Sequence, residues 1–406
     1  MFKKTNIIPV VMGLGYVGLP IFLSLQKKFN VIGYDLNEER IKQLIKKKDI
    51  NNEFKKKDLD IKEGSIFTNN LIDISKGNFF IVTVPTPINS SMKPNLNSII
   101  NCSHDLSKII KKNDIIFYES TVFPTVTEKI CIPILNKSGL VEGKNFYVGY
   151  SPERINPGDK NKTLNLINKI VAFKYSRKKN IVKTVYKNLA KNLYFTNKII
   201  EAEASKVIEN IQRDLNIALV NEIYKVCYKA KINFKSVIKL AKTKWNFIDY
   251  KPGLVGGHCL PVDPYYFSSF AKKTGIKTNV ILAGRKTNND MYKFCLKQII
   301  KKMKDIKKKK SKIKILFLGV SYKPNVADLR NSFSLKLYRS LKQKIKNVYA
   351  FDPILDNKIA KKNQVINHKV DLKKFDLIIN AVNHSMFKNH LKSIKKNKLR
   401  YLELFN

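Results

Sequence analysis

The stretch GLGYVG at residues 13–18 decides the fold of this 406-residue chain. It follows an apolar run at residues 7–12 and opens a segment with helical apolar spacing at residues 17–28. Glycines at this spacing, between a strand and a helix, permit a tight turn that brings the backbone close to a pyrophosphate at the helix N-terminus. Asp35 ends the next expected strand, where its carboxylate would accept hydrogen bonds from ribose hydroxyls and repel a 2′-phosphate. The pattern predicts a domain that binds NAD in preference to NADP.

Strand-like and helix-like segments alternate outward from this motif. Because Pro9 cannot donate to a strand ladder, the first strand is expected to begin near Val10. Residues 201–229 contain no Gly or Pro and place apolar residues on one face, which predicts a long helix. A second strand–helix alternation begins after the lysine-dense residues 301–314. We therefore predict an α/β chain of two Rossmann-like doubly wound domains joined by a central helical domain. The expected domains are residues 1–200, 201–305 and 306–406.

The composition excludes several classes of protein. The formal charge of +47 would suit a nucleic-acid binder, but lysine supplies 70 of the 78 basic residues and is spread along the chain. Base readout and bidentate phosphate contacts favour arginine, so no specific nucleic-acid partner is expected. No apolar run reaches the roughly 18 residues that span a bilayer, so no membrane association is expected. Five scattered cysteines without metal-ligand spacing indicate a reducing, cytoplasmic compartment and no metal site.

Cys259 is the strongest candidate for covalent chemistry. It lies in a glycine-rich loop at residues 252–263, and Asp263 follows four residues later. A thiol can add to an aldehyde, and the adduct can then lose a second hydride to become a thioester. A small buried hydrophobe is the alternative interpretation, and the loop alone does not separate the two. A two-electron hydroxyacid dehydrogenase would fit the fold but would not need this thiol.

Polar residues follow several of the expected strands, at the sheet edge where parallel α/β folds bind ligands. They include Thr83, Pro85 and Thr86 after one strand, and Thr121 and Glu153 after two others. Each group also fits a simpler description, namely a turn with capping hydroxyls or a surface ion pair.

Lys206 and Asn210 are spaced i,i+4, hence on one face of the long helix, where they could stabilise a developing oxyanion. A solvated helix surface explains a lone lysine equally simply.

Taken together in order, these motifs resemble the UDP-glucose/GDP-mannose dehydrogenase family over nearly the full length of the chain. The motifs lie at residues 13–18, 83–87, 119–124, 151–154, 206 with 210, 256–263, and 318–323 running on to 328–332. Within the family, PGLVGGHC at 252–259 with VDPYY at 262–266 is similar to the N-acetylhexosamine branch. The glucose branch usually carries a lysine before the aspartate, where this chain has Val262.

The resemblance implies an NAD-dependent four-electron oxidation of the C6 hydroxyl of a UDP-N-acetylhexosamine to the uronic acid, through a thiohemiacetal and thioester, for surface polysaccharide. It implies catalytic roles for Cys259, Lys206, Asn210, Asp263, Thr121 and Glu153. Cofactor contacts are expected from Gly13, Gly15, Tyr16, Val17, Gly18, Asp35, Arg40, Thr83, Pro85, Thr86, Thr121, Glu153 and Arg330. Substrate contacts are expected from Lys206, Asn210, Tyr250, Gly253, Gly256 and Lys323. A homodimer through the central helices is also implied.

The chain departs from the family pattern at a few positions. Thr125 stands where the family often has glycine, and Ser321 replaces a small apolar residue. Family members usually continue beyond residues 401–406, so the resemblance carries over no substrate contacts from that part of the family. UDP-glucose and UDP-N-acetylmannosamine remain alternative substrates, and a catalytically inactive nucleic-acid binder remains a remote alternative.

Overall fold

The computed structural model of the chain describes residues 7–51, 53–154 and 166–405. The chain divides into two compact units, each described by itself. Unit 1 comprises Met1–Glu209 and Tyr265–Ile276, and unit 2 comprises Asn210–Pro264 and Lys277–Asn406. The helix α7 (Ile199–Ala230) begins in unit 1 and ends in unit 2.

In the described part of unit 1 the strands form one eight-stranded sheet, in the order β3-β2-β1-β4-β5-β6-β7-β8. The strands are β1 (Pro9–Met12), β2 (Ile32–Tyr34), β3 (Ile66–Thr68), β4 (Phe79–Val82), β5 (Ile115–Tyr118), β6 (Tyr147–Tyr150), β7 (Asn168–Ala172) and β8 (Asn192–Thr196). Strand β1 begins at Pro9, one residue earlier than expected, and pairs there with Phe79 of β4. Proline is tolerated at that point because it is the first residue of the strand.

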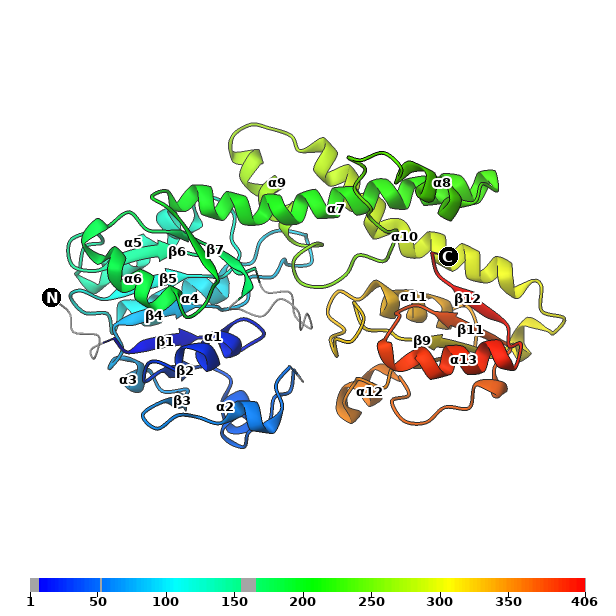
Figure 1. Ribbon diagram of the computed structural model, residues 1–406, viewed down its shortest axis with the longest axis horizontal. Coiled ribbons are helices and arrows are strands. Elements are labelled where there is room, and N and C mark those ends of the chain that lie inside the picture. Colours follow the sequence, from blue (N-terminus) through cyan, green and yellow to red (C-terminus); the bar gives the residue numbers. More distant parts are fainter. Residues whose placement is uncertain (1–6, 52, 155–165, 406) are drawn as a thin grey trace. The chain divides into compact units, whose positions relative to one another are not determined.

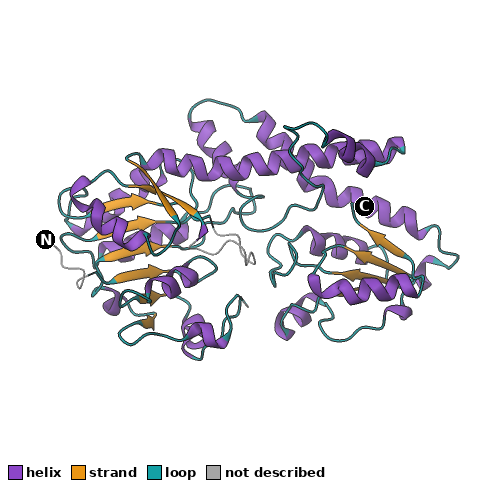
Figure 2. Cartoon of the chain, in the orientation of Figure 1, coloured by secondary structure: helices purple, strands orange, loops and turns teal. Residues whose placement is uncertain are grey.

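Helices connect strands of this sheet along the chain and flank it (Figure 2). They are α1 (Gly18–Leu25), α2 (Glu38–Ile45), α3 (Leu71–Ile74), α4 (Asn97–Ser107), α5 (Ile132–Leu135) and α6 (Lys179–Tyr186). The helix α9 (Asp263–Lys273) follows α7 in the chain and begins in unit 2. One core cluster includes Phe22 of α1, Phe117 of β5 and Tyr186 of α6, all fully buried. Burying a side chain of this size contributes about 1.5–3 kcal/mol to folding.

Strand β7 interrupts the parallel pattern, which the sequence did not indicate. It pairs antiparallel with β6 through Tyr150 and Ala172, and parallel with β8. Antiparallel pairing makes β7 start beside the segment that follows β6. The buried residues of β7 therefore face residues 151–154, an expected part of the site.

Unit 2 contains a four-stranded parallel sheet in the order β10-β9-β11-β12, with α11, α12 and α13 around it (Figure 1). The strands are β9 (Ile315–Leu318), β10 (Val348–Phe351), β11 (Leu377–Asn380) and β12 (Tyr401–Glu403). The helices are α8 (Phe234–Ala241), α10 (Asn279–Met303), α11 (Phe333–Lys342), α12 (Asn357–Asn363) and α13 (Lys388–Lys396).

Alternate residues of β9 face two different cores. Ile315 and Phe317 belong to a cluster with residues of α10 and α11, whereas Leu316 and Leu318 belong to a cluster with Phe387 and residues of α13. In a parallel sheet covered on both faces, each strand is a continuous run of apolar residues. These strands could be recognised from sequence for that reason. The observed architecture confirms the predicted α/β class with two Rossmann-like sheets and a long central helix.

Candidate active site

The glycine turn of unit 1 has the geometry that its sequence predicts. Gly13 has a φ of +93°, which favours glycine, and its N–H donates to the Tyr34 carbonyl at 2.8 Å. A Cβ on Gly18 would lie 1.8 Å from the Gly13 carbonyl oxygen, whereas a Cβ on Gly15 would meet nothing within 4 Å. Val17, the N-cap of α1, makes no side-chain capping bond to the first turn. The turn therefore leaves open space and uncapped helix N–H groups that an anionic ligand can use.

Asp35 and Arg40 fasten this turn to the neighbouring strand and helix. The Asp35 carboxylate accepts from the N–H of Leu14 at 2.8 Å and from the N–H of Asn37 at 2.9 Å. The Arg40 guanidinium is buried and donates to the Leu14 carbonyl and to Asp49, both at 2.9 Å. Its Nη2 atom has no hydrogen-bond partner among the described residues. Both side chains hold the backbone of Leu14, and Asp35 is half-buried beside the turn, so the cradle fits a dinucleotide.

Threonines join the ends of β4 and β5 beside the turn. The Thr83 hydroxyl lies 2.7 Å from the Gly13 carbonyl, and the Thr86 hydroxyl donates to the Thr121 carbonyl at 2.6 Å. Pro85 between them is exposed. The structure thus brings the predicted cofactor residues of these three segments together at one edge of the sheet.

Glu153 lies at the same edge, after β6, and is 6% exposed. Its Oε1 accepts from the N–H of Arg154 at 2.6 Å, and its Oε2 lies 3.2 Å from Nζ of Lys169 on β7. The Arg154 guanidinium pairs with Glu209 of α7. Sequence reasoning missed Lys169. The available signal was a lysine on the strand face of Ile167, Val171 and Phe173, where apolar residues are expected.

Lys206 and Asn210 lie one turn apart on α7 and are 8% and 5% exposed, so neither is a solvated surface residue. Glu203, also on α7, accepts from the backbone N–H groups of Thr125 at 2.6 Å and Thr127 at 2.9 Å. Burial raises the pKa of Glu203 to about 7, and the hydrogen bonds from Thr127 and Thr125 act against that rise. This carboxylate fastens the start of α7 to the segment after β5.

Thr125 has a φ of +85°, which explains why the family often has glycine at this position. A β-branched residue is strained in this region. We expect Thr125→Gly to raise the free energy of unfolding by about 1 kcal/mol, because relief of strain of about 1–3 kcal/mol exceeds glycine's entropic cost of about 0.5–1 kcal/mol. Thr125→Ala should give a smaller gain, since it removes the branch and keeps the Cβ. Urea unfolding of the three proteins tests this, and a glycine variant less stable than wild type would contradict it.

In unit 2, Cys259 is exposed and begins a turn that leads into α9. Its carbonyl accepts from the N–H groups of Val262 and Asp263, both at 2.9 Å. Asp263 is 1% exposed, and its Oδ2 accepts from the Asn210 amide at 2.6 Å. Three of the predicted catalytic residues, Cys259, Asp263 and Asn210, are therefore linked directly within this unit.

A buried chain of polar side chains holds both ends of the Cys259 loop. The Asn221 amide exchanges two hydrogen bonds with the backbone of Gly253, at 2.8 and 3.0 Å. Arg285 donates to the Leu260 carbonyl at 3.3 Å and to Asp214 at 2.5 Å. Asn288 completes the chain by accepting from Asn221 at 2.8 Å and donating to Asp214 at 2.8 Å.

Sequence reasoning missed this chain of contacts, although a signal existed. Asp214 and Asn221 occupy the same helical face as Val207, Ile211 and Ala218, where apolar residues are expected. Buried polar groups must find partners, so polar residues on a core-facing stripe indicate a network.

The loop is also tied to the segment before α11. His258 Nε2 lies 2.7 Å from Asp328 Oδ2, and Asn331 donates to the Gly257 carbonyl at 3.0 Å. A Cβ on Gly256 would lie 2.5 Å from the Asn331 carbonyl oxygen, so this close approach requires glycine. The Arg330 guanidinium donates two hydrogen bonds to Asp328 Oδ2, at 3.0 and 2.6 Å. Burial alone would raise the pKa of Asp328, but the bonds from His258 and Arg330 hold it well below its ordinary value.

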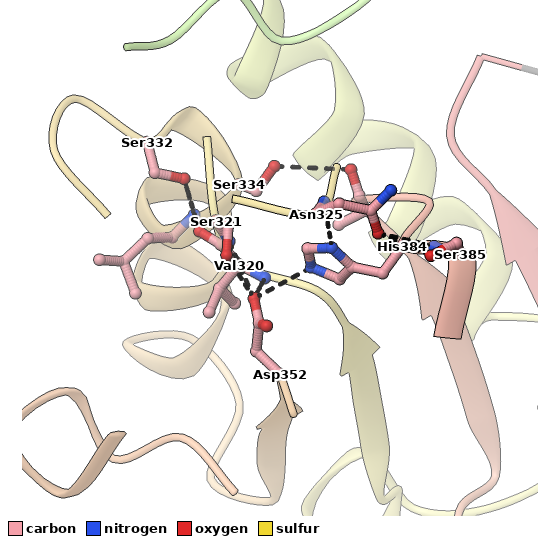
Figure 3. Close-up of polar contacts among 10 residues, drawn as sticks. Val320, Ser321, Asn325, Ser332, Ser334, Asp352, His384 and Ser385 are labelled. Atoms are coloured by element: carbon pink, nitrogen blue, oxygen red, sulfur yellow. Dashed lines mark hydrogen bonds and ion pairs between the residues drawn. The ribbon is translucent and has the colours of Figure 1, made fainter. Parts of the chain in front are cut away.

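The turn after β9 in unit 2 repeats the geometry of the glycine turn in unit 1. Gly319 has a φ of +80° and donates to the Phe351 carbonyl at 2.9 Å, as Gly13 does to Tyr34. Asp352, which follows β10 as Asp35 follows β2, accepts from Val320 N–H at 2.8 Å (Figure 3). Two nucleotide-type turns are therefore built alike although their sequences differ.

Around Asp352, the buried side chains of Ser321 and His384 support the segment that carries Lys323. The Ser321 hydroxyl donates to Asp352 at 2.8 Å, which accounts for a polar residue at this departure from the family pattern (Figure 3). The N–H of Asn325 donates to His384 Nδ1 at 2.9 Å, so Nε2 carries the ring proton and faces Asp352 at 3.3 Å. Lys323 Nζ lies 5.7 Å from the centroid of the Tyr322 ring. Oδ1 of Asp352 has no partner among the described residues.

The predicted site residues divide between the two units. Unit 1 holds Gly13, Gly15, Tyr16, Val17, Gly18, Asp35, Arg40, Thr83, Pro85, Thr86, Thr121, Glu153 and Lys206. Unit 2 holds Asn210, Tyr250, Gly253, Gly256, Cys259, Asp263, Lys323 and Arg330. The described residues contain no group of three or more His, Cys, Asp or Glu side chains that could hold a metal ion. None of the helices in the described ranges has the length and apolar character needed to cross a membrane.

Comparison with known proteins shows the family of the chain. Three models of the UDP-glucose/GDP-mannose dehydrogenase family match in order: the NAD binding domain at residues 8–190, the central domain at 200–290 and the UDP binding domain at 316–401. Protein CapL of Staphylococcus aureus is 42% identical over 97% of this chain and 92% of its own length. The UDP-N-acetyl-D-glucosamine 6-dehydrogenase of Pseudomonas aeruginosa is 41% identical over 93% of this chain and 91% of its own.

A solved structure, that of the UDP-D-ManNAc dehydrogenase from Pyrococcus horikoshii, superimposes with a TM-score of 0.84. It is 30% identical and covers 98% of this chain and 96% of its own. Together with the glycine cradle and the cysteine loop, these matches show that the chain is an NAD-dependent nucleotide-sugar dehydrogenase of the UDP-glucose/GDP-mannose dehydrogenase family.

Proposed function

We propose that this enzyme oxidises the C6 hydroxyl of a UDP-N-acetylhexosamine to the carboxylate, through a thioester on Cys259. The observation that carries the choice of sugar is the identity of 41% to a UDP-N-acetyl-D-glucosamine 6-dehydrogenase, against 30% to the UDP-D-ManNAc dehydrogenase. The exposed Cys259 thiol, on a loop held at both ends, supports the covalent route.

The residues divide the chemistry between them. NAD, when bound, supplies the hydride acceptor, and conversion of an alcohol to an acid consumes two NAD molecules because it removes four electrons. Lys206 and Asn210 donate hydrogen bonds to the C6 oxygen as negative charge develops on it. The Cys259 sulfur adds to the C6 aldehyde, and the resulting thiohemiacetal becomes a thioester after the second oxidation. Asp263, held by the Asn210 amide, transfers protons, and Thr121 and Glu153 orient the water that hydrolyses the thioester.

In this proposal residues 1–200 bind NAD. Residues 201–305 carry the nucleophile and form the dimer interface, and residues 306–406 bind the UDP moiety. Tyr250, Gly253, Gly256 and Lys323 would contact the substrate, and Arg330 would lie near the cofactor. We place the enzyme in the cytoplasm, where UDP-sugars are made, with a uronic acid for surface polysaccharide as the product.

A panel of UDP-sugars tests the substrate. Purified enzyme with NAD should give the highest kcat/KM with UDP-N-acetylglucosamine or UDP-N-acetylgalactosamine, and two NADH per sugar oxidised. A preference for UDP-glucose or UDP-N-acetylmannosamine would contradict the proposed substrate but not the proposed mechanism. A yield of one NADH per sugar would remove the four-electron mechanism. Salt-dependent filter binding to nucleic acid, with no oxidation of any sugar, would favour the inactive binder.

Cofactor choice gives a prediction for Asp35. Because its carboxylate repels a 2′-phosphate, kcat/KM should be higher with NAD than with NADP, and Asp35→Ala should narrow the ratio by roughly tenfold or more. Asp35 also accepts hydrogen bonds from two backbone N–H groups. Asp35→Asn is the matched control, because it removes the charge and keeps a side-chain oxygen that can accept these bonds. Equal use of both cofactors by the wild-type enzyme would contradict the assignment.

Assembly gives a prediction for the central helices. Large apolar side chains in this part of unit 2 are exposed in the single chain, among them Leu219, Val226, Ile232, Leu240, Trp245 and Ile248, with Trp245 at 91%. Patches of this kind indicate protein–protein interfaces. We expect a homodimer at micromolar concentration by light scattering and a monomer for the double variant Leu219→Glu/Val226→Glu. A wild-type monomer would contradict the prediction.

A further inference from the structure

A buried lysine with two carboxylates sits beneath the expected water site of unit 1. Lys169 Nζ lies 2.5 Å from Glu119 Oε2 and 3.2 Å from Glu153 Oε2, and the Lys169 and Glu119 side chains have no exposed surface. The Tyr186 hydroxyl, from α6, donates to Glu119 Oε1 at 2.8 Å. Lysine is almost never fully buried unless paired, so this position calls for a specific reason.

Lys169, Glu119 and Glu153 come from separate elements of the fold and lie in contact. Glu119 follows β5 and Glu153 follows β6. Because β7 runs antiparallel to β6 with Tyr150 opposite Ala172, Lys169 comes opposite Glu153 in register. The Ser151 hydroxyl donates to the Ile170 carbonyl at 2.7 Å and closes the same pair of segments. The antiparallel strand that the sequence did not predict is thus the element that supplies the cation.

The charge balance of the cluster is one cation against two carboxylates. Burial lowers the pKa of Lys169, but Glu119 and Glu153 more than offset this, so its pKa is raised above the ordinary value and it stays charged. Burial raises the pKa of Glu119 to about 7, with Lys169 acting against the rise and Glu153 adding to it. The cation therefore supports two carboxylates of which only Glu153 reaches toward the surface, at 8% exposure of its side chain.

We propose that Lys169 is a positioning residue for Glu153, which it holds in one orientation and in the ionised form, while Glu119 and Tyr186 hold Lys169. The inference deepens the proposed function, because it rests on Glu153 acting on the hydrolytic water. In that step Glu153 takes one proton from water as the oxygen bonds to the thioester carbon. The carbon–sulfur bond then breaks, Cys259 leaves as the thiolate, and the uronic acid is released. No electrons are transferred in this step.

The arrangement predicts shifts of opposite sign for two variants. Lys169→Met leaves two buried carboxylates without a cation, so a higher pH is needed to ionise them. Its hydrolysis rate should reach half-maximum at least one pH unit higher than in wild type. Glu119→Gln leaves Lys169 facing Glu153 alone, so the same midpoint should move to lower pH. Arg154, the next residue in the chain after Glu153, pairs with Glu209 of α7, and both variants retain this ion pair.

Pre-steady-state kinetics with substrate in excess over enzyme assign the effect to the hydrolysis step. With a UDP-N-acetylhexosamine and NAD, Lys169→Met should release close to two NADH per subunit in a rapid burst and then turn over about 10²-fold more slowly than wild type near neutral pH, the scale of a general base. Mass spectrometry should find the acyl adduct on Cys259. The double variant Glu119→Gln/Lys169→Met removes one charge of each sign and should recover much of the loss, whereas a packing defect would be made worse. Lys183→Met, an exposed lysine on α6, is the control that should match wild type.

The outcomes separate this inference from the proposed function. If wild type yields one NADH per sugar, or Glu153→Gln traps no adduct on Cys259, the proposed function fails. If Glu153→Gln traps the adduct but Lys169→Met keeps the wild-type pH profile, the positioning role of Lys169 is overturned. A shift of both variants in the same direction, or a burst reduced as much as turnover, also overturns it. If Lys169→Met does not fold, two other results test the role of Lys169. The pH midpoint of hydrolysis should still move to lower pH in Glu119→Gln, and the double variant should still hydrolyse the thioester; failure of either overturns the proposal.

Discussion

Replacing Cys259 by alanine is expected to abolish uronic acid production while the first, reversible oxidation at C6 remains measurable. Oxidation of an alcohol to an aldehyde needs no thiol, whereas the second oxidation proceeds from the thiohemiacetal that Cys259 forms. Cys259 is also the exposed thiol of the described chain, and burial raises the pKa of the thiols of Cys131 and Cys295 to about 12. These buried cysteines therefore cannot substitute for it at neutral pH.

Cys259→Ser extends this test. The serine oxygen can add to the aldehyde, but an alkoxide is a poorer leaving group than a thiolate, so an ester should accumulate and hydrolyse slowly. NADH counted against uronic acid formed, together with the mass of the intact subunit, measures both variants. Cys227→Ala, which removes a buried thiol from the same unit, is the matched control and should keep two NADH per sugar. Full acid production by Cys259→Ala would leave an ordinary alcohol dehydrogenase in place of the four-electron enzyme.

Lys206→Ala is expected to lower kcat by roughly 10²–10³-fold, the loss typical of one donor to a developing oxyanion. KM should change much less, because the interaction is stronger in the transition state than in the ground state. Lys206 is 8% exposed on α7, so its ammonium is not a solvated surface charge whose removal would be neutral.

Lys229→Ala provides the matched control, since Lys229 is an exposed lysine near the end of the same helix. It should retain wild-type kcat and KM. If Lys206→Ala raised KM and left kcat unchanged, Lys206 would stabilise the bound substrate and the transition state equally, and the proposed role in the transition state would be wrong.

The parts that could be predicted from sequence are those encoded by local patterns. The turn at residues 13–18, the strands of unit 2, the strands β1, β2, β4, β5 and β6 of unit 1, and the long helix α7 follow from local patterns. These patterns are glycine spacing, apolar runs and a 3.6-residue period, which depend on neighbours a few residues apart. Thr125 could likewise be marked from sequence as a departure from the family pattern, and its positive φ in the structure supplies the physical reason. The family and its NAD-binding domain followed from the same ordered motifs.

The tertiary structure decided which buried polar groups meet, since their partners are far apart in the chain. Lys169 reaches Glu119 across 50 residues, and Asn221 reaches Asn288 across 67. A local pattern can mark Lys169 or Asn221 as a polar residue on an apolar face, but it does not say which distant residue is its partner. Such groups are stable inside the protein only when their partners are in place, and those partners are supplied by the antiparallel β7 and by the packing of α7 on α10. Local sequence determined the turns, strands and helices, and the requirement to satisfy buried charge and hydrogen bonds across the fold determined the supports of Glu153 and Cys259.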